Sequence, residues 1–238
     1  MVKAKGGKNV YGAAVGILML ESQFPRIPGD VGHAWTWPFP VLYKVVNGAS
    51  PDRVVNRNAK GLLDEFVRAA RELVATGADG ITTNCGFLSL FQAELSEAIG
   101  VPVAASGLMQ VPWVQALLGP GKRVGVLTVS KSTLTADHLA AAGVGIDTPV
   151  GGTDGGREFS RAILGNGLEL DVDLARADLV EAGERLLADH PDIGALVLEC
   201  TNMVPYSADL AEALGIPVYD FYSFVTWFQA GLCPRRFV

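Results

Sequence analysis

Short apolar runs alternate with segments of helical periodicity along most of the chain, and this pattern predicts its secondary structure. The apolar runs, which we interpret as buried strands, span residues 13–21, 79–84, 101–106, 123–130, 194–199 and 216–220. The helical segments span residues 62–76, 87–99, 133–142, 173–189, 204–214 and 221–232. Strands that alternate with helices in this way predict parallel sheets with helices on both faces, an α/β fold.

Two segments depart from this alternation. Residues 22–58 are rich in proline and contain Trp35, Trp37 and Phe39 without a clear period. A long irregular segment inside a compact domain is typical of a lid or a binding loop, and an ordered surface excursion or a dimer contact fits equally well. The glycine-rich residues 150–156 predict a flexible loop, and no phosphate-binding or dinucleotide-binding fingerprint accompanies them. We therefore expect no cofactor.

An internal repeat pairs two of the three cysteines. Shifted by 115 positions, residues 80–103 align without a gap on residues 195–218, with 8 of 24 positions identical and Cys85 opposite Cys200. A second match, shifted by 109 positions, places residues 15–18 on residues 124–127. Because the two matches occur in the same order, the chain consists of two copies of one α/β unit. Both cysteines directly follow a predicted strand, at the sheet edge where ligands bind, so we expect them to face one cleft.

Composition narrows the class of protein. Hydrophobic residues make up 49% of the chain and charged residues 18%, as in globular proteins. The net charge of −6 argues against nucleic acid, although a local positive pocket could still hold an anionic substrate. No stretch is long enough to cross a membrane, and the first apolar run contains glycines and ends at Glu21, which favours a strand over a signal peptide. Three cysteines without a regular framework suit free thiols in the cytoplasm.

The paired cysteines are candidate acid and base groups. A cysteine at a helix N-terminus feels the positive end of the helix dipole, and the free amides there suit a carboxylate. The dipole contributes only about 0.3–1 kcal/mol, against about 1.36 kcal/mol for one pKa unit, so neighbouring groups must assist ionisation. A two-base exchange of protons also requires one thiolate and one thiol at rest. The alternative is that both cysteines are buried and inert. We give the same inert interpretation to Cys233, which has no partner in the repeat.

These features resemble the Asp/Glu/hydantoin racemase superfamily, which includes amino-acid and hydantoin racemases, arylmalonate decarboxylases and maleate isomerases. The resemblance covers nearly the whole chain. It rests on the duplicated strand-end cysteines, on Cys200-Thr201 after an apolar strand, on Glu21-Ser22 after the first strand, and on the hydroxyl-rich residues 128–133. It implies two pseudosymmetric Rossmann-like lobes, residues 1–107 with 218–238 and residues 108–217, with the active site in the cleft between them.

The resemblance also implies roles for individual residues. Cys85 and Cys200 would act as opposed acid and base at a carbon α to a carboxylate or carbonyl, in a cofactor-independent racemase or epimerase. The substrate would be a small carboxylate or hydantoin-type molecule. The residues expected to bind it are Glu21, Ser22, Asn84, Gly86, Phe87, Thr128, Ser130, Ser132, Thr133, Thr201 and Asn202.

The first cysteine leaves alternatives open. Amino-acid racemases of this superfamily carry Cys-Asn-Thr in the first half, whereas this chain has Thr83-Asn84-Cys85. If Asn84 is the aligned asparagine, Thr83 occupies the cysteine position and Cys200 acts alone, as in a decarboxylase of malonate-type acids or a cis–trans isomerase of maleate-type diacids. The gap-free repeat favours Cys85 instead. A non-catalytic small-molecule binding protein is the third hypothesis.

Two further features concern metals and assembly. The three histidines are scattered without metal-ligand spacing, so we expect no metal site. The aromatic side chains in residues 35–39 and 221–228 exceed what one small core needs, and they predict a homodimer or a higher homo-oligomer.

Overall fold

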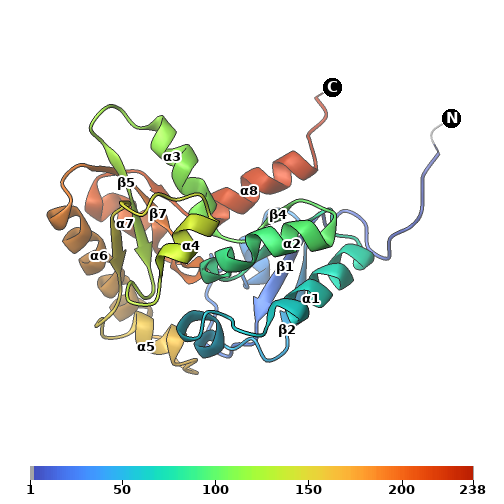
Figure 1. Cartoon of the computed structure of the whole chain (residues 1–238), viewed down its shortest axis with the longest axis horizontal. Helices are drawn as coiled ribbons and strands as arrows, with labels where there is room; N and C mark the ends of the chain where they lie inside the picture. The colour runs from blue at the N-terminus through green and yellow to red at the C-terminus, as the bar shows by residue number, and fades with distance from the viewer. Residues whose placement is uncertain (1–2, 238) are drawn as a thin grey trace.

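The computed structural model, which describes residues 3–237, contains two parallel sheets of four strands each. The first sheet has the order β2-β1-β3-β4, with β1 (Val15–Leu20), β2 (Val41–Val46), β3 (Gly80–Thr83) and β4 (Val103–Ala104). The second has the order β6-β5-β7-β8, with β5 (Arg123–Thr128), β6 (Val150–Gly152), β7 (Ile193–Leu198) and β8 (Val218–Tyr219). Figure 1 shows the two halves side by side, blue to green and green to red. The predicted α/β fold with two parallel-sheet lobes is confirmed.

Eight α-helices connect and cover the described strands. They are α1 (Leu63–Thr76), α2 (Gln92–Ile99), α3 (Val111–Leu117), α4 (Ala136–Ala141), α5 (Phe159–Leu164), α6 (Val172–Asp189), α7 (Ser207–Leu214) and α8 (Phe221–Leu232). Two 3₁₀ segments, η3 (Gly86–Phe91) and η5 (Thr201–Tyr206), lead directly into α2 and α7. Within residues 3–237, none of the helices combines the length and the apolar character that crossing a bilayer requires.

Local sequence explains where the long helices begin and end. The predicted apolar stripe of α1 is buried at Phe66, Ala70 and Leu73, and the helix stops at Gly77, whose φ of 151° suits only glycine. In α6 the side chain of Asp171 accepts hydrogen bonds from two backbone amides of the first turn and so caps the helix.

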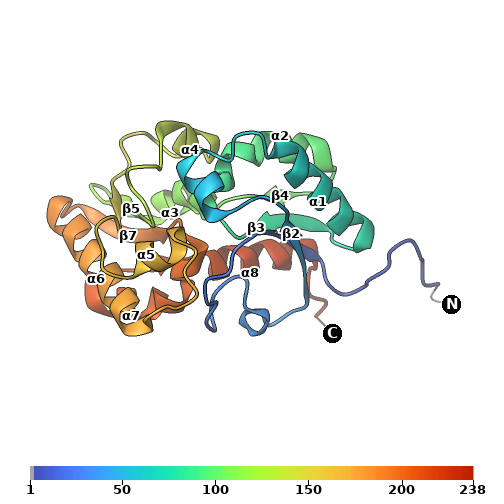
Figure 2. The same ribbon diagram turned by 90° about the horizontal axis from the view of Figure 1, so that it is seen from below.

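Helix α8 covers the sheet of the opposite half. Phe221, Phe224 and Phe228 of α8 share an apolar cluster with Val15 and Ile17 of β1. Figure 2 shows α8 beneath the first sheet, with α1 and α2 on the other side. The predicted division placed residues 218–238 in the first lobe, but β8 pairs with β7 and lies in the second sheet. The reason is the repeat, because β8 occupies in the second sheet the place that β4 has in the first.

The structure reproduces the sequence repeat at the same shift of 115 positions. The pairs η3 and η5, α2 and α7, and β4 and β8 begin and end at matching positions. Both α2 and α7 end at a left-handed glycine, Gly100 with φ 74° and Gly215 with φ 66°. Cys85 and Cys200 are the residues that immediately precede η3 and η5. The architecture therefore places Cys85, and not Thr83, opposite Cys200.

Some elements were missed in the sequence. Strand β2 lies inside the segment 22–58 that we treated as irregular, and β6 lies in the predicted flexible loop 150–156. Both are edge strands: β6 holds two glycines, and β2, apolar except for Lys44, follows two prolines in the irregular segment. In β6, Gly151 lets Leu186 of α6 pack closely, since a Cβ there would lie 3.1 Å from the leucine side chain.

Candidate active site

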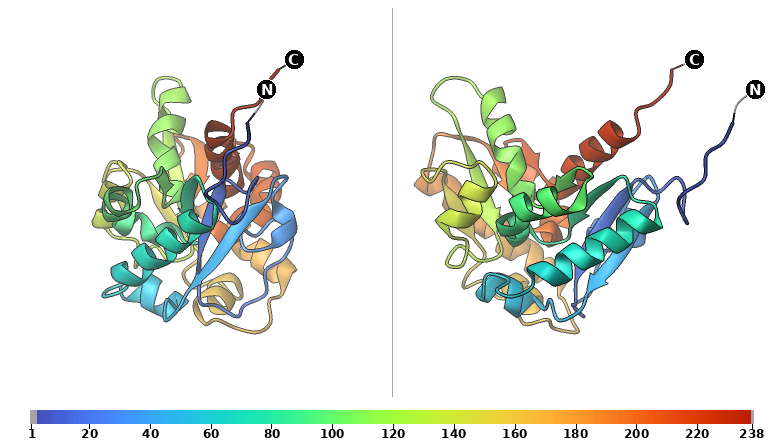
Figure 3. Two further views of the ribbon diagram at one scale, coloured as in Figure 1. Left: turned by 90° about the vertical axis from the view of Figure 1, so that its right-hand side faces the viewer. Right: turned by 45° about the vertical axis from the view of Figure 1, so that its right-hand side comes forward.

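The two paired cysteines line one small cavity between the halves of the molecule. Its volume is about 20 Å³, roughly the room that one water molecule needs. The residues that line it are Phe24, Pro51, Val55, Asn84, Cys85, Gly86, Phe87, Val129, Ile163, Leu164, Glu199, Cys200 and Asn202. The turn η3 of the first half lies beside α4 of the second, so the halves meet closely at this point (Figure 3).

The two thiols have different electrostatic surroundings. Burial and the carboxyl group of Glu199 raise the pKa of Cys85, while the backbone amides of Phe87 and Leu88 and the charge of Arg26 oppose the rise. Burial and Glu199 also raise the pKa of Cys200 well above its ordinary value. For Cys200 only one backbone amide opposes the rise, and the negative charge of Asp30 adds to it. The surroundings therefore favour a thiolate at Cys85 over one at Cys200.

Glu199 is a buried carboxyl group that lines the same cavity as the two thiols. Its Oε2 atom accepts a hydrogen bond of 2.7 Å from the hydroxyl of Thr128, and its Oε1 atom has no partner. Burial raises the pKa of Glu199 to about 7, and the hydrogen bond from Thr128 opposes this rise. The carboxyl group lies against the backbone of Gly86, where a Cβ atom would come within 2.2 Å of Oε1. Only glycine at position 86 leaves room for it.

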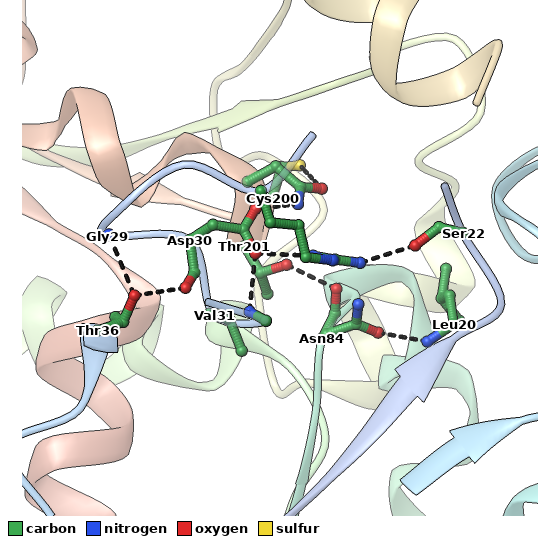
Figure 4. Close-up of polar contacts among 12 residues, drawn as sticks. Leu20, Ser22, Gly29, Asp30, Val31, Thr36, Asn84, Cys200 and Thr201 are labelled. Carbon is green, nitrogen blue, oxygen red and sulfur yellow. Dashed lines mark hydrogen bonds and ion pairs between the residues drawn. The ribbon is translucent and has the colours of Figure 1, made fainter. Parts of the chain in front are cut away.

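A polar network links Cys200 to the segment that follows β1 (Figure 4). The thiol of Cys200 donates to the side-chain oxygen of Asn202 at 3.6 Å, and the Asn202 amide donates to Asp30 at 2.6 Å. Asp30 is buried and forms an ion pair with Arg26 at 2.7 Å. Arg26 also donates to the hydroxyl of Ser22 at 2.8 Å. The network holds the orientation of Asn202, which contacts the thiol.

A second set of hydrogen bonds joins the two halves below the thiols. The hydroxyl of Thr201 donates to the backbone oxygen of Asn84 at 2.6 Å, and both residues are buried. The side-chain oxygen of Asn84 accepts from the amide of Leu20 at 2.7 Å, at the end of β1 (Figure 4). These contacts fix the strand ends that carry Cys85 and Cys200.

Apolar residues from both halves cover the cavity. Phe24 and Val55 come from the segment 22–58, and Ile163 and Leu164 come from α5. The two covering segments are joined where the amide of Gln23 donates to the side chain of Asn166 at 2.6 Å. Residues 22–58 thus lie where a lid would lie, which is one of the interpretations that the sequence allowed.

The structure brings some of the predicted site residues together and leaves others apart. Cys85, Cys200, Asn84, Gly86, Phe87 and Asn202 line the cavity, while Thr128 and Thr201 lie behind it. Ser130 and Ser132 instead hold Asp154, at 3.0 and 2.9 Å. The hydroxyl of Thr133 donates to the backbone oxygen of Ser130, the carboxylate of Glu21 accepts from the amide of Gly48, and Ser22 accepts from Arg26. These five residues bind neighbouring protein groups away from the cavity.

Sequence reasoning missed three residues near the thiols. Glu199 was visible as a charged residue at the end of an apolar strand, directly before a cysteine, where a buried charge needs an explanation. Arg26 and Asp30 lie in the irregular segment, and no local pattern indicated that they fold back onto Asn202. Across residues 3–237, no cluster of three or more His, Cys, Asp or Glu side chains is arranged to hold a metal ion.

Comparison with known proteins gives relatives by sequence. No protein-family model matches the chain. It is 29% identical over 221 residues to a dimethylsulfoniopropionate lyase of Durusdinium sp. clade D, covering 89% of this chain and 72% of that protein. It is 27% identical over 245 residues to dimethylsulfoniopropionate lyase 7 of Emiliania huxleyi (strain CCMP1516), covering 92% and 67%. Against lyase 6 of the same strain, it spans 56% of the relative's length.

Comparison of structures gives the fold. Arylmalonate decarboxylase matches with a TM-score of 0.58 at 17% identity, over 92% of both chains. Allantoin racemase from Pseudomonas fluorescens matches with a TM-score of 0.57 at 15% identity, over 94% of this chain and 99% of that one. Aspartate racemase of Picrophilus torridus matches with a TM-score of 0.55 at 16% identity, over 92% and 95%. The chain therefore shares its two-lobe fold with these decarboxylase and racemase structures, and this is the fold that the sequence resemblance predicted.

Proposed function

We propose that this chain is a lyase that removes the α-proton of a short carboxylate and expels a leaving group from the β-carbon, with dimethylsulfoniopropionate as the first substrate to test. The observation that carries the proposal is the enclosure of two thiols in one cavity, in a chain whose sequence relatives are dimethylsulfoniopropionate lyases. The racemase and decarboxylase fold supports it, since those reactions also create negative charge beside a carboxylate or carbonyl.

In this proposal Cys85 is the base. Its thiolate takes the α-proton, the C–H electron pair becomes the new carbon–carbon double bond, and the bond from the β-carbon to sulfur breaks. The products are acrylate, dimethylsulfide and one proton held by the enzyme. Burial and the charge of Glu199 raise the pKa of both thiols, but at Cys85 the backbone amides of Phe87 and Leu88 and the charge of Arg26 oppose the rise, whereas at Cys200 one amide does. This comparison supports Cys85 over Cys200 as the base. Dimethylsulfide leaves as a neutral molecule, so elimination needs no acid.

The cavity offers contacts to both ends of such a substrate. Phe24 and Phe87 line the cavity with aromatic rings, and such rings attract an onium cation such as dimethylsulfonium. Arg26 already lies over the ring of Phe24, 4.7 Å from its centroid, so Phe87 is the ring we assign to the cation. The carboxylate end suits the side-chain amides of Asn84 and Asn202, which line the cavity. A cavity of about 20 Å³ is smaller than the substrate, so binding requires the covering segments to separate.

The test is product formation in heavy water. We expect the chain to release dimethylsulfide, measured in the headspace by gas chromatography, and to form acrylate in equal amount, measured by NMR. A Cys85→Ser, Cys200→Ser double variant is the matched control, because it removes both thiols and keeps their shape. No dimethylsulfide above this control would contradict the lyase assignment.

A racemase or epimerase is the second candidate, and the paired thiols favour it. In this reaction Cys85 removes the α-proton on one face, and the thiol of Cys200 delivers a proton to the other. The same heavy-water experiment with amino acids, hydantoins and related acids would show deuterium at the α-carbon without a new product. One-thiol decarboxylation of a malonate-type acid would instead release carbon dioxide and survive replacement of one cysteine.

We also propose that the chain self-associates. Trp113 and Trp227 stack edge to face on α3 and α8 with about half of their surface exposed, and Leu117 beside them is 70% exposed. Light scattering after size-exclusion chromatography should give a mass of at least two chains. Trp227→Lys should lower that mass, and a monomeric unchanged chain would reject the proposal.

A further inference from the structure

Glu199 has no role in the proposed reaction, yet its position is unusual for a carboxyl group. It is fully buried, and burying a charge without full compensation is costly. One oxygen is satisfied by Thr128, while Oε1 has no partner although the side chain lines the thiol cavity. Replacement by an apolar residue would remove this cost, so a function is the simplest reason to keep it.

The surroundings of the free oxygen point to the thiols. Oε1 lies against Gly86, the residue after Cys85, and Glu199 itself precedes Cys200. The charge of Glu199 acts on both thiols, as the second largest influence on each after burial. No other carboxyl group lines this cavity among the described residues. A proton leaving the Cys85 thiol therefore has one carboxyl acceptor in the lining of the same cavity.

We propose that Glu199 accepts the proton of the Cys85 thiol, so that the thiolate forms inside the closed cavity. This inference rests on the proposed function in one respect, that a thiolate is the base. The S–H bond of Cys85 breaks, its electron pair stays on sulfur, and the proton binds Oε1 of Glu199. The thiolate then takes the α-proton of the substrate and becomes a thiol again. The proton on Glu199 passes to water when the cavity opens, which balances the proton that the substrate lost.

Few ionisable groups compete for this proton. The thiol of Cys200 donates a hydrogen bond to the side chain of Asn202. Asp30, which accepts a hydrogen bond from Asn202, forms an ion pair with Arg26. His138 of α4 lies behind Phe87, and burial lowers its pKa to about 4, so it stays neutral near pH 7. Glu199 acts on the reaction through the Cys85 thiol, so we assign it as a positioning residue for the proton.

Infrared spectroscopy of the full chain without substrate tests the inference. Between about pH 5 and pH 9 the carbonyl band of a protonated carboxyl group should disappear, and an S–H band should shift at the same pH. Both changes should be absent in Glu199→Gln. Thr128→Val removes the hydrogen bond that favours the carboxylate, so it should move both changes to higher pH. A carboxyl group that titrates without any response of the S–H bands would overturn the inference.

Kinetics separate this role from a structural one. Glu199→Gln should lower kcat by about 10²-fold with KM nearly unchanged, and Thr128→Val should move the acidic limb of the pH profile upward. A limb that stays in place in Thr128→Val would contradict the role of Glu199. Because the spectra need no substrate, coupled bands in a chain without lyase activity would reject only the proposed function. Uncoupled bands in an active lyase would reject only the role of Glu199.

Discussion

The two strand-to-helix junctions that carry the thiols have the same backbone but different side chains. Each consists of a strand, a cysteine, a 3₁₀ turn and an α-helix that ends at a left-handed glycine. In the first half the cysteine stands between Asn84 and Gly86, and in the second between Glu199 and Thr201. Duplication therefore preserved the geometry that presents a thiol, while the residues beside it diverged.

The divergence makes the two thiols unequal. The neighbours of Cys200 carry the charge of Glu199 and the amide of Asn202, whereas the matching positions in the first half hold the neutral Asn84 and the apolar ring of Phe87. Gly86, which matches Thr201, has no side chain and leaves a gap. The gap at Gly86 accommodates the carboxyl group of Glu199 from the other half. An exchange of protons between two thiols needs such inequality, because one must be ionised while the other keeps its proton.

Replacing each cysteine by serine tests the inequality most strongly. We expect Cys85→Ser to lower dimethylsulfide release by about 10³-fold, because a serine hydroxyl is too weak a base, and Cys200→Ser to lower it by only about tenfold. Headspace gas chromatography on matched amounts of folded protein measures both. Equal losses in the two variants would mean that the elimination needs both thiols alike, and a larger loss in Cys200→Ser would reverse the assignment of the base.

The sequence predicted the repeated part of the fold well for a physical reason. Buried parallel strands are continuous apolar runs, and the repeat made each half a control for the other, so the equivalence of Cys85 and Cys200 could be predicted. The edge strand β2 (Val41–Val46) is apolar except for Lys44, but it follows Pro38 and Pro40 in an irregular segment, which hides it. Its place in the sheet depends on pairing with β1, which no local pattern encodes.

The candidate site was predictable only where its residues are close in sequence. Asn84, Gly86, Phe87 and Asn202 were found because they adjoin the cysteines. Ser130 and Ser132 were expected at the site but instead hold Asp154, a contact over 22 to 24 positions that sequence spacing does not reveal. The covering residues and the contact between Asp30 and Asn202, 172 positions apart, arise from tertiary packing alone.

The charge of Glu199 should appear in the pH dependence of stability. The pKa of Glu199 is about 7 in the folded chain, against an ordinary value of 4.5. Between pH 4.5 and pH 7, the folded state therefore keeps a proton on Glu199 that the unfolded state has already lost. The stability contributed is complete below about pH 4.5 and is lost as the pH rises through 7, by roughly 3 kcal/mol in all. Urea denaturation should show Glu199→Gln gaining stability relative to the unchanged chain over this range. A constant difference between the two proteins would contradict the raised pKa.

Exchanging the small residue at the first junction tests why the halves differ. Gly86→Ala places a Cβ atom 2.2 Å from Oε1 of Glu199, so one of the two groups must move. We expect a loss of roughly 1–3 kcal/mol in unfolding free energy together with a large loss of activity. The double variant Gly86→Ala, Glu199→Ala removes the clash with the side chain but keeps the one with the backbone oxygen of residue 199, at 2.4 Å, so it should recover part of the stability without the activity. No recovery would show that the glycine serves the backbone alone.

The contact that ties the junctions together should give the smallest effect. Thr201→Val keeps the shape of the side chain but removes the hydrogen bond to the backbone oxygen of Asn84 and leaves that buried acceptor unpaired. We expect a loss of about 1–2 kcal/mol in unfolding free energy, measured by urea denaturation, with thiol chemistry weakened but present. Thr201→Ser keeps the hydroxyl and is the matched control, with a loss of less than about half that amount. Equal losses in the two variants would mean that the methyl packing of Thr201, and not its hydrogen bond across the halves, holds Cys85 and Cys200 at one cavity.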